Sequence, residues 1–524
     1  MPANSQDETI AFLRSAGFDD GDASTVETIV THISTVLLSG ERAIKLKRPV
    51  HLPYVDFSTP ERRLATCERE LVLNRRTAPK LYRAVRRVTR EADGGLAIDG
   101  GGPLVDAFVD MRRFDADCLL DRMAMEGTLT APLMARLAHR IAAFHTGIAP
   151  DRSVTGAAAV ALVLDINERA LATTEVFPEA AVADFNRRFR EGFARLTPLL
   201  DARSVAGKIR RCHGDLHLRN ICVFEGEPTL FDCLEFDEAI ATTDILYDLA
   251  FLLMDLWHRG LEEGANLVLN RYLDECDETD GLPLLAFLMA LRAAVRAHVT
   301  ATRVADAGPD APTLRAEAHD YFDLALDLLR PRAGRLVAVG GLSGSGKSTV
   351  AAAIAPRIGP PPGARILASD RIRKHLFGVA AETPLPAECY RPEVSETVYA
   401  RLAEQADAIL PLGHGVVADA VFDRAPDRER IAGIGEGGAL PFLGLWLEAP
   451  PERLVERVAA RRGDPSDATP QVVRDQLSRS QAPTDWTHLS SEGEIGAVAE
   501  AARRVVDGTL DGPAGNLEDD RRKG

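Results

Sequence analysis

Hydrophobic and polar positions follow different patterns in the two parts of the chain. After about residue 335, short apolar runs alternate with helical segments. These runs are LVAVGG (336–341), RILASD (365–370), GVVADAVF (415–422) and PFLGLWLEA (441–449). Short apolar strands separated by helices predict a parallel sheet covered by helices. We therefore expect an α/β domain over residues 335–511.

The first 114 residues contain most of the predicted strands of the N-terminal part. A helix and strand-like segments come first, among them STVLLSG (34–40) and ERAIKLKRP (41–49). A helical run over 61–76 follows, and further strands end near LVDAFVDMRRF (104–114). This order predicts a small strand-rich lobe over about residues 25–114.

Residues 115–328 are mostly helical in pattern. CHGDLHLRNICVF (212–224) and TLFDCLEF (229–236) interrupt the helices and are typical of a short hairpin. A strand-rich lobe followed by a larger helical lobe is the α+β, two-lobed layout of a kinase-like fold. We therefore expect one kinase-like domain over residues 1–328.

The segment LRPRAG (329–334) indicates the boundary between the two domains. It follows the helical run DYFDLALDLL (320–329) and precedes an apolar strand. A helix followed by Pro, Arg and Gly and then a new strand is typical of a hinge. The polar tail over 512–524 is expected to be disordered.

The overall charge of the chain excludes one broad class of function. The 524 residues carry 78 acidic and 62 basic side chains, for a formal net charge of −16. A general nucleic-acid binder needs a basic face to neutralise phosphates, so we expect none here. A local basic pocket remains compatible with this balance, because a phosphate site needs only a few cations.

Cysteine and hydropathy patterns indicate a cytoplasmic protein. The seven cysteines are scattered without a CxxC pair or a Cys/His cluster, which suggests neither a zinc site nor a disulfide framework. The N-terminus has acidic residues and no long apolar run, unlike a signal peptide. Apolar stretches such as GAAAVALVL (156–164) are shorter than the ~20 residues that span a bilayer. We expect no membrane association, and the sequence indicates no oligomeric state.

A phosphate-binding loop opens the C-terminal domain. Gly341, Gly346, Lys347 and Ser348 satisfy the pattern GxxxxGK[ST], with an apolar strand before it and a helix-forming segment after it. Backbone N–H groups of such a loop face phosphate oxygens, its Lys reaches the β- and γ-phosphates, and its Ser binds Mg²⁺. The expected nucleotide-binding residues are Gly341, Ser343, Gly344, Ser345, Gly346, Lys347, Ser348 and Thr349.

Two aspartates follow neighbouring strands of this predicted sheet. Asp370 ends RILASD, where an acceptor would meet the γ-phosphate, so it is a candidate general base; a helix N-cap is its other interpretation. Arg373 and Lys374 are candidates for neutralising phosphate or an anionic substrate. Asp419 ends the strand in GVVADAVF, at the position that would act on Mg²⁺.

Arginines near residue 460 are candidates for a lid over ATP. Arg457, Arg461 and Arg462 precede an acidic loop. Arginines that close over ATP stabilise the charge that develops during phosphoryl transfer. A solvated, charged helix face is the plainer interpretation of each. With the SDxxRK, VVADAVF and RxxxRR elements, residues 335–510 resemble small P-loop kinases related to gluconate kinase, polynucleotide kinase and the zeta-toxin family, proteins of the AAA type that bind ATP.

The stretch CHGDLHLRNI (212–221) carries the chemistry of the N-terminal domain. A kinase-like fold needs a carboxylate facing the acceptor hydroxyl, an amide five residues later to bind Mg²⁺, and a second carboxylate to bridge the metals. Asp215, Asn220 and Asp232 meet this spacing. His213 is expected to brace the loop, and a buried structural histidine is an equally good interpretation.

The pattern HGDxHxxN resembles the catalytic loop of aminoglycoside phosphotransferases and of related choline and homoserine kinases, over about residues 30–300. The resemblance implies that Asp215 is the catalytic base, that Asn220 and Asp232 bind metal, and that Asp248 supports the loop. It also implies a strand lysine paired with a helix glutamate, and a hinge that contacts adenine.

The candidates for these N-lobe positions lie in three segments. Lys45 and Lys47 share one face of ERAIKLKRP, so either could be the strand lysine, and Lys45 is preferred. Glu70 is its preferred partner, with Glu68 as the alternative, while ordinary charged faces would explain both pairs. Met111 lies where the hinge is expected.

Three hypotheses of function remain open at this point. The chain is either a bifunctional enzyme that uses ATP and Mg²⁺ to phosphorylate hydroxyl groups of small molecules at two sites, a small-molecule kinase regulated by a P-loop ATPase domain, or a nucleotide-sensing module with little turnover. More candidate residues support the first hypothesis than the other two, because each domain has its own candidate base, metal ligand and phosphate-binding cation. Fold family does not fix the substrate.

Overall fold

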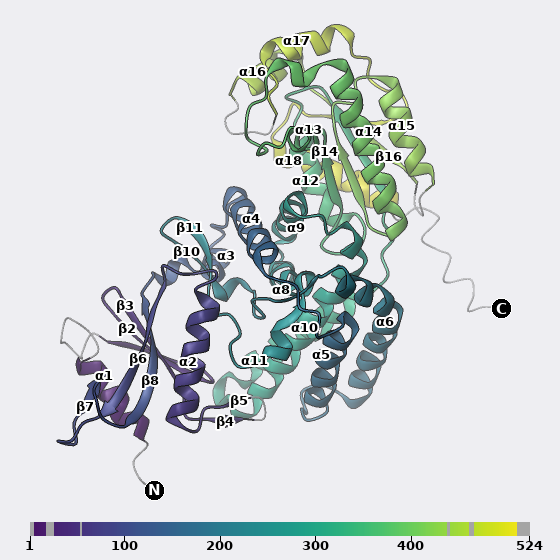
Figure 1. Cartoon of the computed structure of the whole chain (residues 1–524). Coiled ribbons are helices and arrows are strands. Elements are labelled where there is room, and N and C mark those ends of the chain that lie inside the picture. Colours follow the sequence, from purple (N-terminus) through teal and green to yellow (C-terminus); the bar gives the residue numbers. More distant parts are fainter. Residues whose placement is uncertain (1–4, 17–25, 53–54, 438–440, 461–465, 511–524) are drawn as a thin grey trace. The chain divides into compact units, whose positions relative to one another are not determined.

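The computed structural model describes residues 5–16, 26–52, 55–437, 441–460 and 466–510 (Figure 1). The chain forms two compact units, and we describe each by itself. Unit 1 comprises Met1–Arg259 and Leu291–Tyr321, and unit 2 comprises Gly260–Ala290 and Phe322–Gly524. Residues 260–290 thus belong by their contacts to the C-terminal unit. The domain limits at residues 328 and 335 stay a prediction from the sequence.

A six-stranded antiparallel sheet forms the first lobe of unit 1, in the order β1-β2-β3-β8-β6-β7. Alternation along β3 places Ala43 in a core with Cys67 of α2, and Ile44 in a second core with Leu13 of α1. Helices therefore cover both faces of the sheet. The elements are α1 (Ser5–Ala16), β1 (Glu27–Val30), β2 (Ser34–Ser39), β3 (Arg42–Lys47), β4 (His51–Leu52), β5 (Val55–Asp56), α2 (Pro60–Asn74), β6 (Tyr82–Arg90), β7 (Leu96–Ile98) and β8 (Leu104–Arg112).

Helices dominate the residues after β8, as the pattern predicted. The hairpin of β10 and β11 interrupts them, with Ile221 paired to Leu230. The two-lobed kinase-like fold is thus confirmed. The elements up to the next sheet are α3 (Leu120–Met125), α4 (Ala131–Gly147), α5 (Gly156–Leu171), α6 (Glu179–Val205), β9 (Ile209–Arg211), β10 (Ile221–Phe224), β11 (Glu227–Leu230), α7 (Glu238–Ala241), β12 (Thr242–Asp244), α8 (Ile245–His258), α9 (Glu262–Glu275), α10 (Leu285–Arg303) and α11 (Ala311–Leu328).

Unit 2 contains a five-stranded parallel sheet in the order β14-β15-β13-β16-β17. Helices α12 and α18 lie on one side of it, and α14 and α15 lie on the other (Figure 1). The predicted α/β fold is confirmed, and the last strand was not predicted. The elements are β13 (Leu336–Gly341), α12 (Lys347–Ile354), β14 (Arg365–Ala368), α13 (Ser369–Leu376), α14 (Pro392–Ile409), β15 (Val416–Asp419), α15 (Ala425–Glu436), β16 (Leu443–Glu448), α16 (Pro451–Ala460), α17 (Pro470–Arg479), β17 (Thr487–Ser490) and α18 (Ile495–Leu510).

Helix α9 covers the free edge of β14 within unit 2. The Nδ2 group of Asn266 donates to the carbonyls of Pro362 and Ala364, both at 3.0 Å. Asp274 pairs with Arg365 at 2.8 Å and with Arg371 of α13 at 3.4 Å. Side chains of α9 thereby satisfy backbone groups at the edge of the sheet, which would otherwise offer them to another strand.

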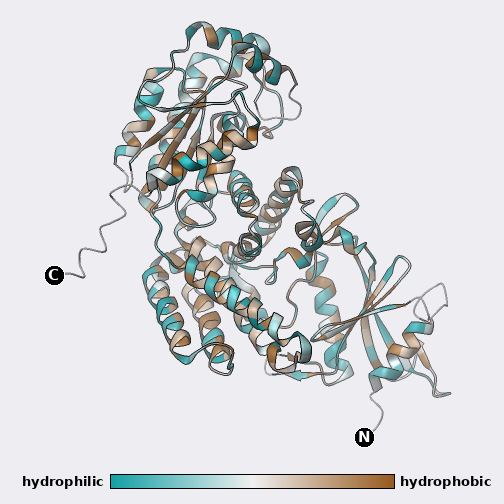
Figure 2. Ribbon diagram, turned by 180° about the vertical axis from the view of Figure 1, so that it is seen from behind, coloured by the Kyte–Doolittle hydropathy of each residue, from teal (hydrophilic) through white to brown (hydrophobic). Residues whose placement is uncertain are grey.

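The hydropathy of the chain follows this layering. The strands of the C-terminal sheet are largely hydrophobic, while many helices are hydrophilic along one side (Figure 2). One stretch, Thr279–Arg303, is long and apolar enough to cross a membrane, although buried core helices pass the same test, and 72% of its most apolar window is buried inside the structure. All seven cysteines are free, and five of them are buried.

Candidate active sites

Two lysines of β3 share one glutamate of α2. Lys45 Nζ lies 2.8 Å from Glu70 Oε1, and Lys47 Nζ lies 2.6 Å from Glu70 Oε2. The two lysines differ in their second partner, because Lys45 also pairs with Asp232 whereas Lys47 pairs with Glu235. Glu68, the alternative partner, is exposed. The arrangement brings Lys45 and Glu70 together with Asp232.

The charges in this cluster are stabilised by one another. Burial raises the pKa of Glu70, but the ammonium groups of Lys45 and Lys47 outweigh it and lower this pKa to about 2. Burial lowers the pKa of Lys45, while Asp232 and Glu70 more than offset it and hold the pKa well above its usual value. A buried ion pair with good geometry keeps both partners ionised. Lys45 is therefore held charged next to Asp232.

The loop after β9 places a carboxylate and an amide side by side. Asn220 Nδ2 donates to Asp215 Oδ2 at 2.8 Å and to the Asp215 carbonyl at 2.9 Å. His217 Nδ1 accepts the N–H of Arg219 at 3.3 Å, so its Nε2, 3.4 Å from Asp215 Oδ2, carries the proton. Burial raises the pKa of Asp215, but His217, His213 and Arg292 outweigh it and hold the pKa below its usual value. Asp215 is thus ionised at neutral pH.

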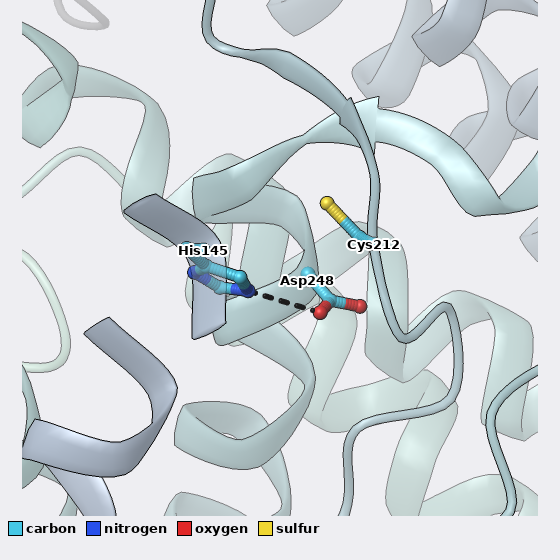
Figure 3. Close-up of side chains that lie close together, drawn as sticks. All are labelled: His145, Cys212 and Asp248. Atoms are coloured by element: carbon cyan, nitrogen blue, oxygen red, sulfur yellow. Dashed lines mark hydrogen bonds and ion pairs between the residues drawn. The ribbon is translucent and has the colours of Figure 1, made fainter. Parts of the chain in front are cut away.

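Asp248 of α8 holds this loop in place. Its Oδ2 accepts the N–H of His213 at 3.1 Å, and its Oδ1 accepts the N–H of Gly214 at 2.8 Å. Its Oδ2 also lies 3.1 Å from His145 Nε2 (Figure 3). Burial raises the pKa of Asp248, but the hydrogen bond and charge of His145 outweigh it and lower the pKa to about 2. The carboxylate therefore supports the loop as an anion.

His145, Cys212 and Asp248 lie close enough to share a metal ion, with ligand atoms within 4.8 Å of one another (Figure 3). Their hydrogen bonds favour a structural role instead. Burial raises the pKa of the Cys212 thiol well above its usual value, and its Sγ donates to the Thr243 carbonyl at 3.6 Å. A thiol must lose its proton to bind a metal. The cluster is best explained as the support of the Asp215 loop.

The β10–β11 hairpin brings Asp232 to the same site. The Phe231 N–H donates to the Asn220 carbonyl at 3.0 Å, and His213 Nε2 lies 2.9 Å from the Phe231 carbonyl. Asp232 has a left-handed backbone with φ of 61°, and its N–H donates to Tyr82 Oη at 3.2 Å. The amide oxygen of Asn220 and the carboxylate of Asp232 are the ligand types that suit Mg²⁺. These residues fit the metal that the fold implies.

Met111 lies near the end of β8 and is buried. It pairs in register with Ala43 of β3 and Tyr82 of β6. The chain then leaves the sheet toward the helical lobe. Met111 therefore lies beside the connection between the two lobes, where the sequence predicted the hinge.

The phosphate-binding loop of unit 2 joins β13 to α12. Gly346 has φ of 90° at the start of α12, and a Cβ on Gly341 would lie 2.6 Å from the Leu447 carbonyl. Lys347 Nζ donates to the Leu342 carbonyl at 3.2 Å, within the loop. Ser343 and Ser345 are buried in the loop beside Gly344, while Ser348 and Thr349 are exposed in the first turn of α12. Its glycine conformations and helix N-terminus suit a phosphate.

The two candidate aspartates of unit 2 lie at one end of the sheet. Asp419 ends β15 and pairs in register with Val339 of β13 and Ala368 of β14. Asp370 is the second residue of α13, whose N-cap is Ala368, so the N-cap interpretation of Asp370 does not hold. Carboxyl ends of parallel strands meet at one edge of the sheet. Asp370 and Asp419 therefore lie at the carboxyl ends of the strands, the same end of the sheet at which the phosphate-binding loop follows β13.

Arg373, Lys374 and Arg457 are held by protein groups. Arg373 donates to the Cys389 carbonyl at 2.7 Å, and its guanidinium lies 4.7 Å from the centre of the Tyr390 ring. Lys374, almost fully buried, pairs with Asp467. Arg457 donates to the Ser491 carbonyl at 2.7 Å and to the Gly344 carbonyl at 3.4 Å, which places it against the phosphate-binding loop. Arg461 and Arg462 lie outside the described residues.

Sequence reasoning missed several residues of both sites. Gln476 of α17 accepts the N–H of Ser343 at 2.9 Å, so it touches the phosphate-binding loop. Tyr82 fixes Asp232, and Asn74 Oδ1 accepts the N–H of Cys233 at 2.9 Å. No local pattern marks these side chains, because their partners are distant in the sequence.

Comparisons with known proteins agree with the two-domain architecture. The family described as "Phosphotransferase enzyme family" matches residues 56–288, and the one described as "AAA domain" matches residues 336–483. The uncharacterized protein Rv2004c of Mycobacterium tuberculosis (strain ATCC 25618 / H37Rv) is 30% identical over 479 residues, which are 89% of this chain and 92% of that protein. The adenylyl-sulfate kinase of Myxococcus xanthus (strain DK1622) is 28% identical over 125 residues, 24% of this chain and 63% of that enzyme.

Solved structures resemble each part of the chain separately. A gluconokinase from Sinorhizobium meliloti 1021 is 22% identical, with 34% of this chain and 96% of that chain covered and a TM-score of 0.25. The aminoglycoside phosphotransferase APH(4)-Ia is 12% identical, with 62% of this chain and 99% of that chain covered and a TM-score of 0.36. The match to the mycobacterial protein spans nearly the whole of both chains. The chain therefore belongs to the same family as that protein and joins a phosphotransferase-family domain to a P-loop kinase domain.

Proposed function

We propose that the chain is a bifunctional ATP-dependent phosphotransferase with one active site in each unit, each transferring the γ-phosphate of ATP to a hydroxyl group of a small molecule. One observation supports the proposal: each unit holds a carboxylate that could act as the base, oxygen ligands that could bind Mg²⁺ and an ammonium group that could bind phosphate. In unit 1 these are Asp215, Asn220, Asp232 and Lys45. In unit 2 they are Asp370, Ser348, Asp419 and Lys347.

In unit 1 we assign a role to each side chain from its contacts. Asp215 is ionised and accepts the proton of the acceptor hydroxyl, while the hydroxyl oxygen bonds to the γ-phosphorus and the bond to the β,γ-bridging oxygen breaks, so that ADP leaves with the electron pair. Lys45, oriented by Glu70, neutralises phosphate oxygens. Asn220 and Asp232 would hold Mg²⁺, which when bound neutralises charge on the phosphates.

In unit 2 the same chemistry uses a different scaffold. The loop before α12 binds phosphate with backbone N–H groups, and Lys347 leaves the Leu342 carbonyl to reach the phosphate oxygens. Asp370 accepts the hydroxyl proton at the end of β14, and Arg457 stays close to the phosphate-binding loop through Gly344. Ser348 and Asp419 would hold Mg²⁺ there.

A phosphorylation screen tests the proposal. A cytoplasmic metabolite extract is incubated with ATP and the wild-type chain, the Asp215→Ala variant or the Lys347→Ala variant, and new phosphorylated products are identified by mass spectrometry. We expect two sets of products, with each variant losing one set and retaining the other. Loss of all products in Lys347→Ala alone would favour the regulatory ATPase. Unchanged ATP consumption in both variants would favour the nucleotide sensor.

A further inference from the structure

A recess in unit 1 opens beside the Asp215 loop. Its lining includes His217, Arg219, Arg296 and Tyr321, and its empty volume is ≈ 220 Å³. His217 lies 3.4 Å from Asp215, so the recess adjoins the base of the proposed reaction. The recess is partly open to solvent, so it can take one end of a small ligand rather than enclose a whole molecule.

The charged residues that line the recess are mostly positive. The lining contains three arginines, Arg219, Arg259 and Arg296, and one carboxylate, that of Asp255. Asp255 is already engaged, because its Oδ1 accepts from Arg259 Nε at 3.0 Å and its Oδ2 accepts the N–H of Leu218 at 3.0 Å. It thus has little capacity left to bind a cationic ligand.

Carboxylates behind the lining compensate these arginines unequally. Asp121 pairs with Arg219 at 3.3 Å and also with Arg259, so these two arginines share Asp121 and Asp255. Arg296 pairs with Glu317 at 3.5 Å, and the charges of Asp255 and Asp215 also act on it. Its ion pair is longer than those that Arg219 and Arg259 make, so its guanidinium is the least tightly held by a carboxylate.

Arg296 is also well positioned to receive a ligand. Its guanidinium lies 5.2 Å from the centre of the Tyr321 ring, and Tyr321 stacks on His258 with ring centres 4.0 Å apart. Its side chain is 17% exposed, so part of it still reaches solvent in the recess. A guanidinium fixed in a partly desolvated site binds carboxylate or phosphate through paired hydrogen bonds.

We propose that this recess binds the acceptor of unit 1 and that the acceptor carries an anionic group, a carboxylate or a phosphate, which Arg296 binds while a hydroxyl of the same molecule faces Asp215. This inference rests on the proposed function of unit 1. A cationic acceptor, such as an amino alcohol, would meet the guanidinium groups of Arg219, Arg259 and Arg296 along the lining, while an anionic group can pair with Arg296. The ligand class is therefore a small hydroxylated anion.

Turnover measurements with three acceptor panels test this inference. The Lys347→Ala chain, silent at the P-loop site, is given ATP with sugar acids, hydroxy acids and sugar phosphates, with neutral sugars and polyols, or with amino alcohols and aminoglycosides. ADP release is measured for each compound. We expect turnover only with members of the anionic panel, and we expect Asp215→Ala to remove it. Carboxylates and phosphates within that panel distinguish the two anionic groups.

Variants of Arg296 then separate binding from catalysis. We expect Arg296→Gln to raise KM for the active acceptor at least tenfold, with a smaller change in kcat, and Arg296→Lys to restore part of the affinity. Arg195→Gln, an exposed arginine of α6, is the matched control and should leave both constants unchanged.

Two outcomes would overturn the inference without touching the proposed function. They are Asp215-dependent turnover with the neutral or cationic panel alone, and an unchanged KM for an anionic acceptor in Arg296→Gln. Absence of Asp215-dependent turnover with every panel would instead refute the proposed function of unit 1, and the inference with it.

Discussion

Asn270 of α9 accepts the backbone N–H of Ile366 in β14 through its Oδ1 atom, at a distance of 2.7 Å. The same oxygen accepts from Arg365 at 3.1 Å, and Asn270 Nδ2 donates to the Ala364 carbonyl at 3.1 Å. The phosphotransferase family matches residues 56–288, which include this helix. A helix within the range of one family therefore completes the edge of the sheet that carries the other site.

Replacing Asn270 by alanine should destabilise unit 2. The change leaves the Ile366 N–H of β14 and the Arg365 guanidinium without this partner, while the Ala364 carbonyl keeps Asn266, and each lost partner costs about 1–3 kcal/mol. We expect the free energy of unfolding to fall by about 3 kcal/mol in urea titrations. The control is Glu262→Ala, an exposed position of the same helix, which should change the stability little. Equal effects of the two variants would contradict the role of α9.

The two lysines of β3 should separate activity from stability. Lys45 contacts Asp232, so Lys45→Met is expected to lower kcat of the Asp215-dependent activity about 100-fold while Glu70 keeps Lys47 as its partner. Lys47→Met leaves buried Glu235 without its ammonium partner and should cost about 3 kcal/mol of stability. Steady-state kinetics and urea unfolding of both variants check this. If Lys47→Met stayed stable and lost more kcat than Lys45→Met, Lys47 rather than Lys45 would be the lysine that contacts phosphate.

Acid should weaken unit 1 through Asp248. The pKa of this carboxyl is about 2 in the folded chain, below the ~3.9 of an unfolded chain. Because the folded-state pKa is the lower one, the stabilisation is present above pH ~4 and is lost as the pH falls toward 2. It amounts to about 2–3 kcal/mol.

Pulse proteolysis with pepsin in urea, from pH 4 to pH 2.5, measures this loss. The Asp248→Asn variant cannot titrate at this position, so its stability should depend less on pH than that of the wild type. Identical pH dependence in the two proteins would show that Asp248 does not contribute.

Replacing Asp370 should lower the catalytic rate at the P-loop site and leave ATP binding there unchanged. Asp370 is the second residue of α13, next to the end of β14, and does not belong to the loop that binds phosphate. We expect Asp370→Asn to lower kcat of the Lys347-dependent activity by roughly 10²–10⁴-fold, as for loss of a general base. Calorimetric titration with ATP should show little change in affinity. A large loss of ATP binding with unchanged kcat would exclude Asp370 as the base.

Local motifs were predictable from the sequence because short spacings determine their geometry. The segment from Gly341 to Ser348 lies between a strand and a helix, so its phosphate-binding shape follows from a few residues. Asp215 and Asn220 belong to one turn, and a hairpin of fixed length adds Asp232. The alternation of side chains along β3 places Lys45 and Lys47 on the same face, so it could not show which of them is the strand lysine. In the structure Glu70 pairs with both, through one carboxylate oxygen each.

Long-range partners were not predictable in the same way. Arg373 was a candidate for substrate contact, but its partners Cys389 and Tyr390 depend on how a distant loop folds back. One feature of the sequence could have indicated the role of α9. Two asparagines four residues apart, Asn266 and Asn270, lie on an otherwise apolar helix face. Buried asparagines need partners, and here those partners lie about 100 residues away in the sequence.

ATP turnover in a set of four chains tests the central claim most directly. The wild type, Asp215→Ala, Lys347→Ala and the double variant are assayed with the acceptors found in the metabolite screen. Two independent active sites predict that each single variant loses turnover of one acceptor and keeps wild-type turnover of the other, and that only the double variant is silent. Loss of both activities in either single variant would contradict two independent sites.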